Sequence, residues 1–331
     1  MLSYIHDLDP VLIRFTENLA IRWYGLAYIA GFIAGYLLLK LLSKRQLYPV
    51  PPDKLGDFIT MTAIFGVLIG GRLGHFFFYQ IPNEGIDAFL ADPWAVFRVW
   101  EGGMASHGGM IGVLLYTWWY ARRHKISWLA ITDGLAIVAP AGLFFGRIAN
   151  FINGELFGRV TDAASAVTMK FPAEIMETSF PRDKWFELLG RVEQAAGQLS
   201  PGNTFYAKSR WMIDLARENG AVREILGGYL APRYPSQLYE AAAEGLLLFA
   251  VLWWVRLRYP KAPNGTFCML FCFLYAIARI VTECYREPDS DMWYGITRGQ
   301  YLSFGLVLGG ILFAIPVVRE WKRRRRTATE N

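Results

Sequence analysis

The sequence is poor in charged residues and in cysteine. Only 19% of its 331 residues are charged and 54% are hydrophobic, whereas soluble domains carry about 25% charged residues. The three cysteines, Cys268, Cys272 and Cys284, lie in or beside one apolar run, and no second pair occurs elsewhere. This spacing argues against a disulfide framework or a zinc site, and it favours small packing residues.

The sequence instead contains long apolar runs. Seven of them approach or exceed the roughly 20 residues that cross a bilayer: residues 23–42, 58–79, 104–120, 129–146, 237–255, 266–284 and 301–318. We therefore predict an all-α polytopic membrane protein with seven transmembrane helices. The first twenty residues have neither a basic start nor an apolar centre. No cleavable signal peptide is expected, and the first span should remain as an anchor.

The positive charges lie mainly in alternate loops. Basic residues follow the first, third, fifth and seventh predicted spans, as in Arg122, Arg123 and Lys125 and in residues 322–326. The positive-inside rule then places the N-terminus outside and the C-terminus in the cytoplasm. Because the net charge of +6 is concentrated between spans, it does not indicate nucleic-acid binding.

Two segments are too polar to span a membrane. Residues 81–103 form a predicted outer-side arm, in which Phe89, Trp94, Phe97 and Trp100 suit the headgroup layer. Residues 159–234 form a predicted small extracytoplasmic head between spans four and five, with helix-like stretches at 183–194 and 210–218. The expected division is thus a membrane domain over 1–158, a head over 159–234, and a second membrane part over 235–331.

The most informative segment is residues 146–158, GRIANFINGELFG, at the end of the fourth span. An arginine at the centre of a membrane helix costs about 2.5–3.5 kcal/mol on insertion scales, and less near the interface, so Arg147 needs a partner, water or a ligand. In the predicted orientation, ionisable groups from several spans meet it on the outer side: Arg72, His75, His107, Glu240, Glu244, Arg279, Glu283 and Arg286. Such a polar cavity, open to the outer leaflet and rich in arginine, suits a lipid phosphate.

Each of these residues also has a structural interpretation. Arg279 and Glu283 can neutralise each other as an i,i+4 pair, Arg72 can snorkel or pair locally, and His75 can be a packed histidine. Structural polar groups should, however, scatter through both halves of the membrane. The concentration of all of them on one side therefore favours a functional site.

Four motifs carry a resemblance to a known family. Residues 146–158, together with SHGGMIG at 106–112, PSQLYE at 235–240 and IRWYGL at 21–26, closely resemble bacterial prolipoprotein diacylglyceryl transferases. The similarity runs from about residue 9 to about residue 319. Ala149 stands where that family usually has glycine, and Tyr234 where it often has histidine, so no catalytic histidine is expected at that position.

The resemblance implies a multi-pass enzyme of the bacterial inner membrane, with a periplasmic N-terminus. It would transfer the diacylglyceryl group of phosphatidylglycerol to the lipobox cysteine of a preprolipoprotein signal peptide, which forms a thioether and releases glycerol 1-phosphate. Such an enzyme would be surrounded by membrane lipids, and no metal or organic cofactor is expected. The implied catalytic residues are His107, Arg147 and Arg279. The implied lipid-binding residues are Tyr24, Asn150, Asn153, Glu155, Gly158, Gln237, Glu240, Tyr275, Glu283 and Arg286.

The sequence leaves the activation of the thiol open. A thiol needs a base or a positive field to become the nucleophilic thiolate. His107 is one candidate base, since imidazole exchanges protons near neutral pH; of the other histidines, His6 lies in the N-terminal tail, His75 in an aromatic run and His124 in a cytoplasmic loop. An arginine field is the alternative. The competing interpretations are a transporter, a phospholipid hydrolase or another headgroup transferase, and a purely structural scaffold.

Overall fold

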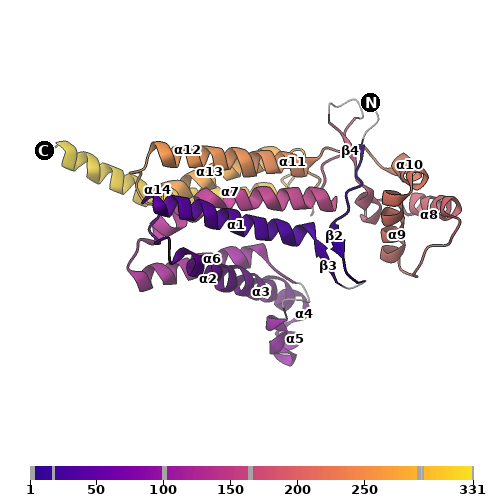
Figure 1. The fold of residues 1–331 in the computed structure, drawn as a ribbon, viewed down its shortest axis with the longest axis horizontal. Coiled ribbons are helices and arrows are strands. Elements are labelled where there is room, and N and C mark those ends of the chain that lie inside the picture. Colours follow the sequence, from indigo (N-terminus) through magenta and orange to yellow (C-terminus); the bar gives the residue numbers. More distant parts are fainter. Residues whose placement is uncertain are drawn as a thin grey trace. The chain divides into compact units, whose positions relative to one another are not determined.

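The computed structural model describes residues 4–16, 19–98, 103–162, 167–288, 292 and 294–329. This part of the chain is mostly helical, and Figure 1 follows the elements from the N-terminus to the C-terminal helix. The chain forms two compact units. Unit 1 comprises Met1–Phe32, Pro140–Ala250 and Phe273–Leu308, and unit 2 comprises Ile33–Ala139, Val251–Cys272 and Gly309–Asn331.

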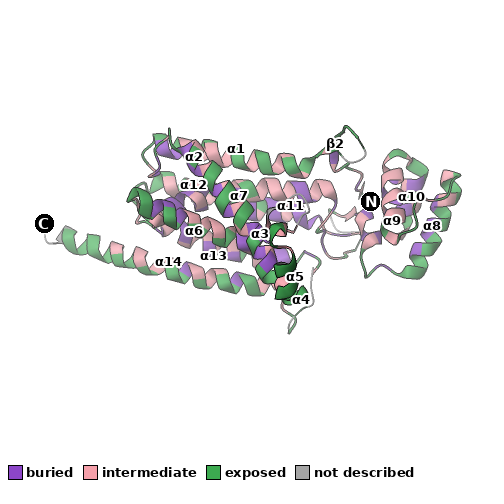
Figure 2. Cartoon of the chain, turned by 90° about the horizontal axis from the view of Figure 1, so that it is seen from below, coloured by how far each residue is buried: buried purple, intermediate pink, exposed green. Residues whose placement is uncertain are grey.

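The long helices are built from the predicted apolar runs. Within the described residues, six helical segments are long and apolar enough to cross a membrane: α1 (Trp23–Lys44), Leu55–Glu84, α7 (Trp128–Asn153), Ser236–Arg258, α13 (Thr266–Glu283), and Arg298–Thr327 within α14 (Arg298–Thr329). In the most apolar windows of α1 and α14 only 11% of residues are buried, and Figure 2 shows exposed residues along both helices. Apolar side chains that face outward need lipid around them, so the chain is a multi-pass membrane protein.

Two of these segments are not regular α-helices throughout. Leu55–Glu84 consists of α2 (Leu55–Met61), the π-helix η1 (Thr62–Ile69), α3 (Gly70–His75), the π-helix η2 (Phe76–Gln80) and α4 (Ile81–Glu84). Ser236–Arg258 consists of α11 (Ser236–Glu240), the π-helix η6 (Ala241–Leu247) and α12 (Leu248–Arg258). Local π-helical turns are rare and occur frequently at functional sites.

Unit 2 contains a close contact between two helices through glycine. The helical segment formed by η1 and α3 packs against α6 (Ser106–His124), where Gly66, Gly70 and Gly74 face Gly108 and Gly112. A Cβ atom placed on Gly74 would lie 2.4 Å from the Cα of Gly108, so only glycine permits this approach. Small residues at four-residue spacing are typical of membrane helices that pack closely.

Unit 2 also contains the start of α13. The buried carboxylate of Asp133, on α7, accepts hydrogen bonds from the backbone N–H groups of Gly265, Phe267 and Cys268 at 2.7–2.9 Å. The first N–H groups of a helix have no partner within the helix. Asp133 therefore caps α13 from a neighbouring helix.

In unit 1, residues 172–230 form a small helical core. It consists of η5 (Pro172–Met176), α8 (Arg182–Ala196), α9 (Phe205–Glu218) and α10 (Gly220–Tyr229), packed around buried residues that include Trp185, Met212 and Leu226. Thr204 and Asn219 accept backbone hydrogen bonds at the starts of α9 and α10. The helices predicted at 183–194 and 210–218 are thus confirmed as α8 and the second half of α9.

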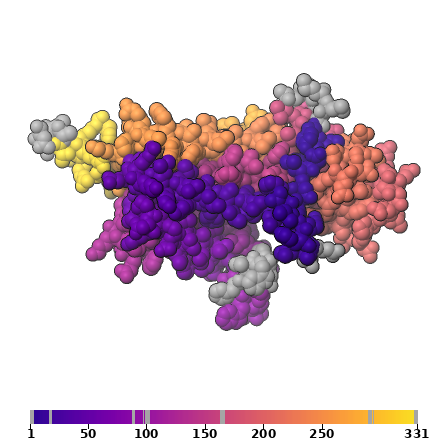
Figure 3. All heavy atoms as spheres, in the orientation of Figure 1, coloured from indigo at the N-terminus to yellow at the C-terminus, as the bar shows by residue number. Residues whose placement is uncertain are grey.

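The N-terminal residues complete unit 1. The parallel pair β1 (Tyr4–Ile5) and β4 (Met169–Lys170) and the antiparallel pair β2 (Val11–Arg14) and β3 (Ala20–Arg22) are short. Figure 3 shows the N-terminal segment, in indigo, against the salmon-coloured residues of this helical core. Asp7 lies 3.0 Å from Arg223 of α10. The described part of the chain is therefore mostly but not entirely helical. The short strands pair because backbone polar groups outside the helices also need hydrogen-bond partners.

The structure supports the predicted spans in part. The run predicted over 104–120 is present as α6 but is not among the six membrane-length apolar segments; Ser106 and His107 begin it, and Arg122 and Arg123 lie in its last turn. The predicted arm contains α5 (Ile86–Ala91) and the 3₁₀-helix η3 (Pro93–Phe97). Trp94 is 73% exposed. Trp100 and the side chains of Phe89 and Phe97, which belong to the same prediction, lie outside the described residues.

The glycine contact predicts opposite effects for two similar substitutions. Gly74→Ala should lower the melting temperature of the purified protein in detergent, because the new methyl group collides with the backbone of α6 and overpacking costs about 1–3 kcal/mol. Gly35→Ala, in α1, meets no atom within 4 Å. It should leave the melting temperature unchanged or raise it, because alanine is the better helix former. Equal melting temperatures for the two variants would contradict the assigned contact.

Candidate functional site

Unit 1 brings six charged side chains from three helical segments into one network, the arginine–glutamate cluster. Its members are Arg147 on α7, Glu240 and Glu244 on α11 and η6, and Arg279, Glu283 and Arg286 on α13 and just beyond it. The carboxylates of Glu240 and Glu244 are fully buried, whereas the side chains of Arg147 and Arg279 are 16% and 12% exposed. The cluster is therefore closed on its glutamate side and accessible on its arginine side.

The two buried glutamates are each shared between arginines. Arg147 lies 3.0 Å from Glu240 through Nη1 and 3.0 Å from Glu244 through Nη2. Arg279 Nη1 lies 2.6 Å from Glu240 and 3.3 Å from Glu244. Arg286 donates to Glu240 at 3.1 Å. Because a buried carboxylate is stable only when it is paired and hydrogen-bonded, these contacts fix α7, η6 and α13 together.

Close helix approach makes this sharing possible. A Cβ on Gly245 would lie 2.7 Å from the Cβ of Phe144, so the backbone next to Glu244 packs directly on α7, one turn before Arg147. Thr282 donates to Glu244 at 3.0 Å. Arg279 also pairs with Glu283, and Gly299 of α14 packs against that carboxylate, since a Cβ there would lie 2.5 Å from Glu283 Oε2.

The end of the signature forms a loop that the PSQLYE motif holds in place. Gln237 donates to the backbone oxygen of Glu155 at 2.7 Å, and Ser236 donates to that of Leu156 at 3.1 Å. Gly154 has a positive φ of 67° where α7 ends, a conformation that favours glycine. Two of the four motifs thus fold as one structure.

Gly158 has a packing role at the end of this loop. Its N–H donates to the backbone oxygen of Tyr234 at 2.9 Å. A Cβ atom there would lie 2.4 Å from this oxygen and 2.6 Å from that of Tyr285. Gly158 also forms a β-bridge with Arg286. The residue therefore positions an arginine of the cluster through the backbone.

Two residues of the signature, Asn150 and Glu155, belong to another group of hydrogen-bonded side chains. Asn150 is buried and donates to Glu155 at 2.7 Å. Tyr24 of α1 shares a side-chain hydrogen bond with Asn150. Tyr275 is an electrostatic neighbour of Arg147 and Arg279. Tyr24, Asn150 and Glu155 thus form one hydrogen-bonded group, and Tyr275 lies near two arginines of the cluster.

One predicted site residue, His107, lies in unit 2. It is half-buried in the first turn of α6, next to the glycine contact with α3. All other predicted site residues belong to unit 1.

Arg72 and His75, which the sequence groups with the arginines, also belong to unit 2. Arg72 donates to the backbone oxygens of Ala95, Val96 and Gly103 at 2.6–3.2 Å. The His75 ring stacks on Tyr79. Both contacts correspond to the structural interpretation of these residues, in which Arg72 fixes the arm to α3.

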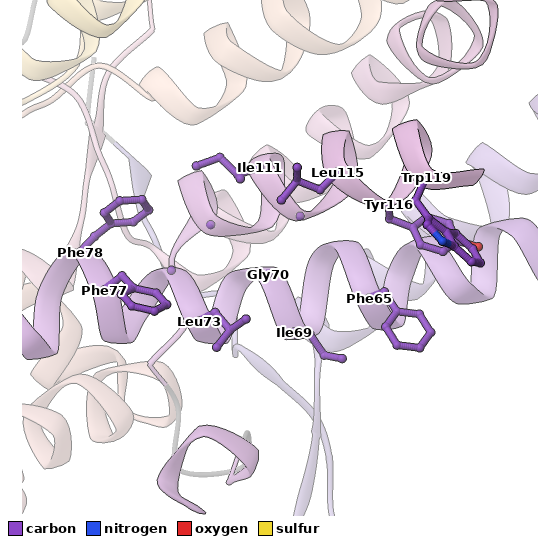
Figure 4. A pocket seen from close by; sticks show the side chains of 13 residues that line it. Phe65, Ile69, Gly70, Leu73, Phe77, Phe78, Ile111, Leu115, Tyr116 and Trp119 are labelled. Atoms are coloured by element: carbon purple, nitrogen blue, oxygen red, sulfur yellow. The ribbon is translucent and has the colours of Figure 1, made fainter. Parts of the chain in front are cut away.

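An apolar cavity of about 640 Å³ lies in unit 2 between the helix of η1, α3 and η2 and the helix α6 (Figure 4). Its wall consists of side chains such as Phe65, Phe77, Leu115 and Trp119, and glycines of both helices contribute backbone. None of its lining residues is a predicted site residue. Its surface suits hydrocarbon rather than polar chemistry.

Sequence reasoning missed several contributors to the site. Glu244, one turn beyond Glu240, is among the ionisable groups expected at the site, but it is not among the predicted catalytic or lipid-binding residues. Thr282 and Gly299 give no comparable signal, because their role depends on which helix packs against them. Arg233 was also missed: it pairs with Glu174 at 3.0 Å and Glu287 at 3.2 Å and donates to the backbone of Gly158.

Known proteins resemble the chain over nearly its whole length. The family described as prolipoprotein diacylglyceryl transferase matches residues 10–316. A phosphatidylglycerol–prolipoprotein diacylglyceryl transferase from Bdellovibrio bacteriovorus is 38% identical, over 94% of this chain and 93% of its own length. Proteins of the same name from Neisseria gonorrhoeae and Burkholderia orbicola are 37% and 36% identical. Those alignments cover 93% and 98% of this chain, and 95% and 97% of the relatives.

The cluster geometry predicts a large cost for removing one buried charge. Glu244→Gln keeps the size of the side chain but leaves Arg147 and Arg279 without one of their two shared carboxylates. Breaking a buried ion pair costs about 3–5 kcal/mol, so thermal unfolding in detergent should occur at a clearly lower temperature. Glu320→Gln removes an equal charge from an exposed pair with Arg323 and Arg324 and should unfold like the unmodified protein. The same melting temperature for both variants would disprove the role of Glu244.

Proposed function

Since the chain belongs to the prolipoprotein diacylglyceryl transferase family, we propose that its arginine–glutamate cluster holds the phosphate of phosphatidylglycerol during transfer of the diacylglyceryl group. The chain is a transferase, and its substrates are phosphatidylglycerol and a prolipoprotein. The names of its relatives favour this activity over transport and over hydrolysis or exchange of the lipid headgroup.

The reaction requires one bond to break as another forms. The sulfur of the acceptor cysteine attacks the glyceryl carbon that carries the phosphate oxygen, and the carbon–oxygen bond breaks. The bonding electrons stay with oxygen, so glycerol 1-phosphate leaves and a thioether remains on the protein. Negative charge grows on the leaving phosphate, and donors fixed around that group stabilise the transition state. The thiol proton must pass to a base.

The observation that carries the proposal is that Arg147 and Arg279 share both buried glutamates while part of each arginine side chain stays exposed. A guanidinium has five N–H donors in a planar fork, and the two contacts of Arg147 leave donors for a further anion. The three arginines and three glutamates of the cluster cancel in formal charge, so the cluster does not attract an anion by net charge. Binding of phosphate then depends on directed hydrogen bonds, in which arginine differs from lysine.

The remaining predicted residues support this arrangement. Tyr24, Asn150 and Glu155 are joined by hydrogen bonds, and Gln237 and Gly158 hold the signature loop that contains Glu155. We assign to them the shape of the lipid-binding surface and the orientation of the arginines.

Arg147→Lys tests the phosphate site directly. Purified enzyme, phosphatidylglycerol and a lipobox peptide are incubated, and thioether peptide and glycerol 1-phosphate are measured. We expect Arg147→Ala to be inactive and Arg147→Lys to lose about 10- to 100-fold in rate, the effect of one charged hydrogen bond. Arg191→Lys, on the surface of α8, serves as the control and should keep full activity. Unchanged turnover in Arg147→Lys would show that a point charge suffices and that the fork has no role.

The same assay tests the supporting residues. Asn150→Ala removes the donor to Glu155 without adding volume, so the protein should fold while most of its activity is lost. Glycerol 1-phosphate release without peptide modification in the unmodified enzyme would indicate a hydrolase and contradict the transferase.

For His107 we propose that it accepts the thiol proton or orients the group that does. A base must be unprotonated to act, so a rate that depends on this base should fall at acidic pH. His107→Gln should be much slower and should lack this acidic limb. If the variant keeps nearly full rate with an unchanged pH profile, an arginine field must activate the thiol instead.

We propose seven spans in the bacterial inner membrane, with α6 as the third span, the N-terminus and residues 159–234 periplasmic, and the C-terminus cytoplasmic. The basic loops after alternate spans support this orientation. In a variant whose three native cysteines are replaced by serine, single cysteines introduced at positions 127 and 200 should react with an impermeant thiol reagent from opposite sides. Labelling of both from one side would overturn the topology.

A further inference from the structure

Arg233 is a buried cation that the reaction proposed above does not use directly. Its side chain is 7% exposed, and its guanidinium lies over the ring of Phe157 at 4.8 Å. Nη2 donates to Glu174 at 3.0 Å. Nη1 donates to Glu287 at 3.2 Å and to the backbone oxygen of Gly158 at 3.1 Å. Because acceptors surround the edge of the guanidinium and an aromatic ring covers one face, these contacts fix its orientation.

The three hydrogen-bond partners of Arg233 belong to different parts of unit 1. Glu174 is buried and belongs to η5 of the helical core formed by residues 172–230. Gly158 is the last residue of the signature, and Glu287 follows the end of α13. One guanidinium therefore fixes the helical core, the signature loop and the segment after α13 to one another.

Backbone hydrogen bonds around Arg233 extend this connection to the cluster. Arg233 and Met169 of β4 exchange two such bonds, at 2.8 and 2.9 Å. The next residue, Tyr234, accepts from the N–H of Gly158 at 2.9 Å. Gly158 in turn forms the β-bridge with Arg286. Four segments thus lie side by side in hydrogen-bonded order: β4, residues 233–234, residues 158–159 and residues 285–287.

Arg286 is both the last member of this series and a member of the arginine–glutamate cluster. Its side chain is 5% exposed and donates to Glu240 at 3.1 Å. A buried ion pair offsets the cost of burial only when its geometry is good. Because the backbone of Arg286 is paired with Gly158, and Arg233 holds Gly158 from the other side, a shift of the signature loop would move Arg286 relative to Glu240. The two other arginines of the cluster bind the same carboxylate and would be displaced with it.

We propose that Arg233 is a positioning residue of the transferase, which holds Arg286, through Gly158, in the geometry that binds the lipid phosphate. This assignment rests on the proposed function and deepens it, because it names a residue outside the cluster on which the phosphate site depends. Arg233 is too deeply buried to contact substrate, so it acts only through its neighbours. Such an effect can be large, since a displacement of about 1 Å that starts far from the reacting atoms can cost about 100-fold in rate.

A substitution that keeps the charge of Arg233 tests this role. Arg233→Lys retains a cation beside the buried Glu174, so the protein should fold. One nitrogen then takes the place of the two that serve Glu174 and Gly158, and the contact with Gly158 should be lost. Turnover with saturating phosphatidylglycerol and lipobox peptide should fall about tenfold, the effect of one hydrogen bond from a charged group.

Arg223 provides a matched control for a purely structural role. It is an arginine of α10 that lies 3.0 Å from Asp7 and donates to two backbone oxygens of α9. Arg223→Lys therefore disturbs a similar set of contacts within unit 1, away from the signature loop. It should lower the melting temperature but keep the turnover of the unmodified enzyme. If Arg233→Lys behaves in the same way, Arg233 has only a structural role and the assignment is overturned.

Combination with Arg286→Lys shows whether Arg233 acts through Arg286. The effects of independent residues multiply, whereas those of coupled residues do not. If Arg233 serves to place the guanidinium of Arg286, Arg233→Lys should slow the Arg286→Lys enzyme by no more than about twofold. The same loss of about tenfold in both backgrounds would show that Arg233 acts by another route, and it would overturn the assignment.

A second variant keeps the test decisive if Arg233→Lys fails to fold. The side chain of Glu287 is 47% exposed, so Glu287→Gln should fold while it loosens the hold on Arg233. It should slow the unmodified enzyme but not the Arg286→Lys enzyme, and unchanged turnover would overturn the assignment. If the unmodified enzyme forms no thioether, the proposed function fails and this assignment fails with it. Failure of the assignment alone leaves the unmodified enzyme active.

Discussion

Two buried carboxylates, Glu240 and Glu244, control the architecture of unit 1. Neither has any exposed surface, so each must be compensated within the protein, and both are compensated by the same pair of arginines from different helices. Desolvation of these charges is costly, and the arrangement is stable only when all partners are present. This requirement explains why η6 packs so closely on α7 at Gly245, and why Thr282 directs its hydroxyl to Glu244.

The signature has two structural halves with different tasks. Its helical half delivers Arg147 and Asn150 from the last turns of α7. Its loop half makes mainly backbone contacts, through Gln237, Ser236 and the β-bridge between Gly158 and Arg286. The side chains that we propose to contact substrate are thereby separated from the groups that fix their positions, and Arg233 strengthens the second set by binding Gly158 and two carboxylates.

Much of this could be predicted from the sequence, because polar residues in apolar runs are costly and therefore conspicuous. That argument identifies Arg147, Glu240 and Arg279 and predicts that they meet. It fails for Arg72, since a sequence cannot show that three backbone oxygens will satisfy an arginine. It fails for His6 as well, because a polar N-terminal tail gives no sign that one of its side chains becomes 96% buried. The π-helical turns depend on tertiary packing and have no clear sequence pattern.

The long sequence distance between Arg147 and its partners has a consequence for biosynthesis. Arg147 and Glu244 are 97 residues apart, and bacterial chains grow at about 5–20 residues per second, so about 5–20 s pass before the partner has been made. During that interval the C-terminal end of α7 carries a cation without its buried carboxylate partners. The nascent chain must keep this end near water or near the insertion machinery until the later helices arrive. The arginine–glutamate cluster is therefore among the last parts of unit 1 to form, and a truncated chain that lacks α13 also lacks Arg279, one of the two arginines that share both glutamates.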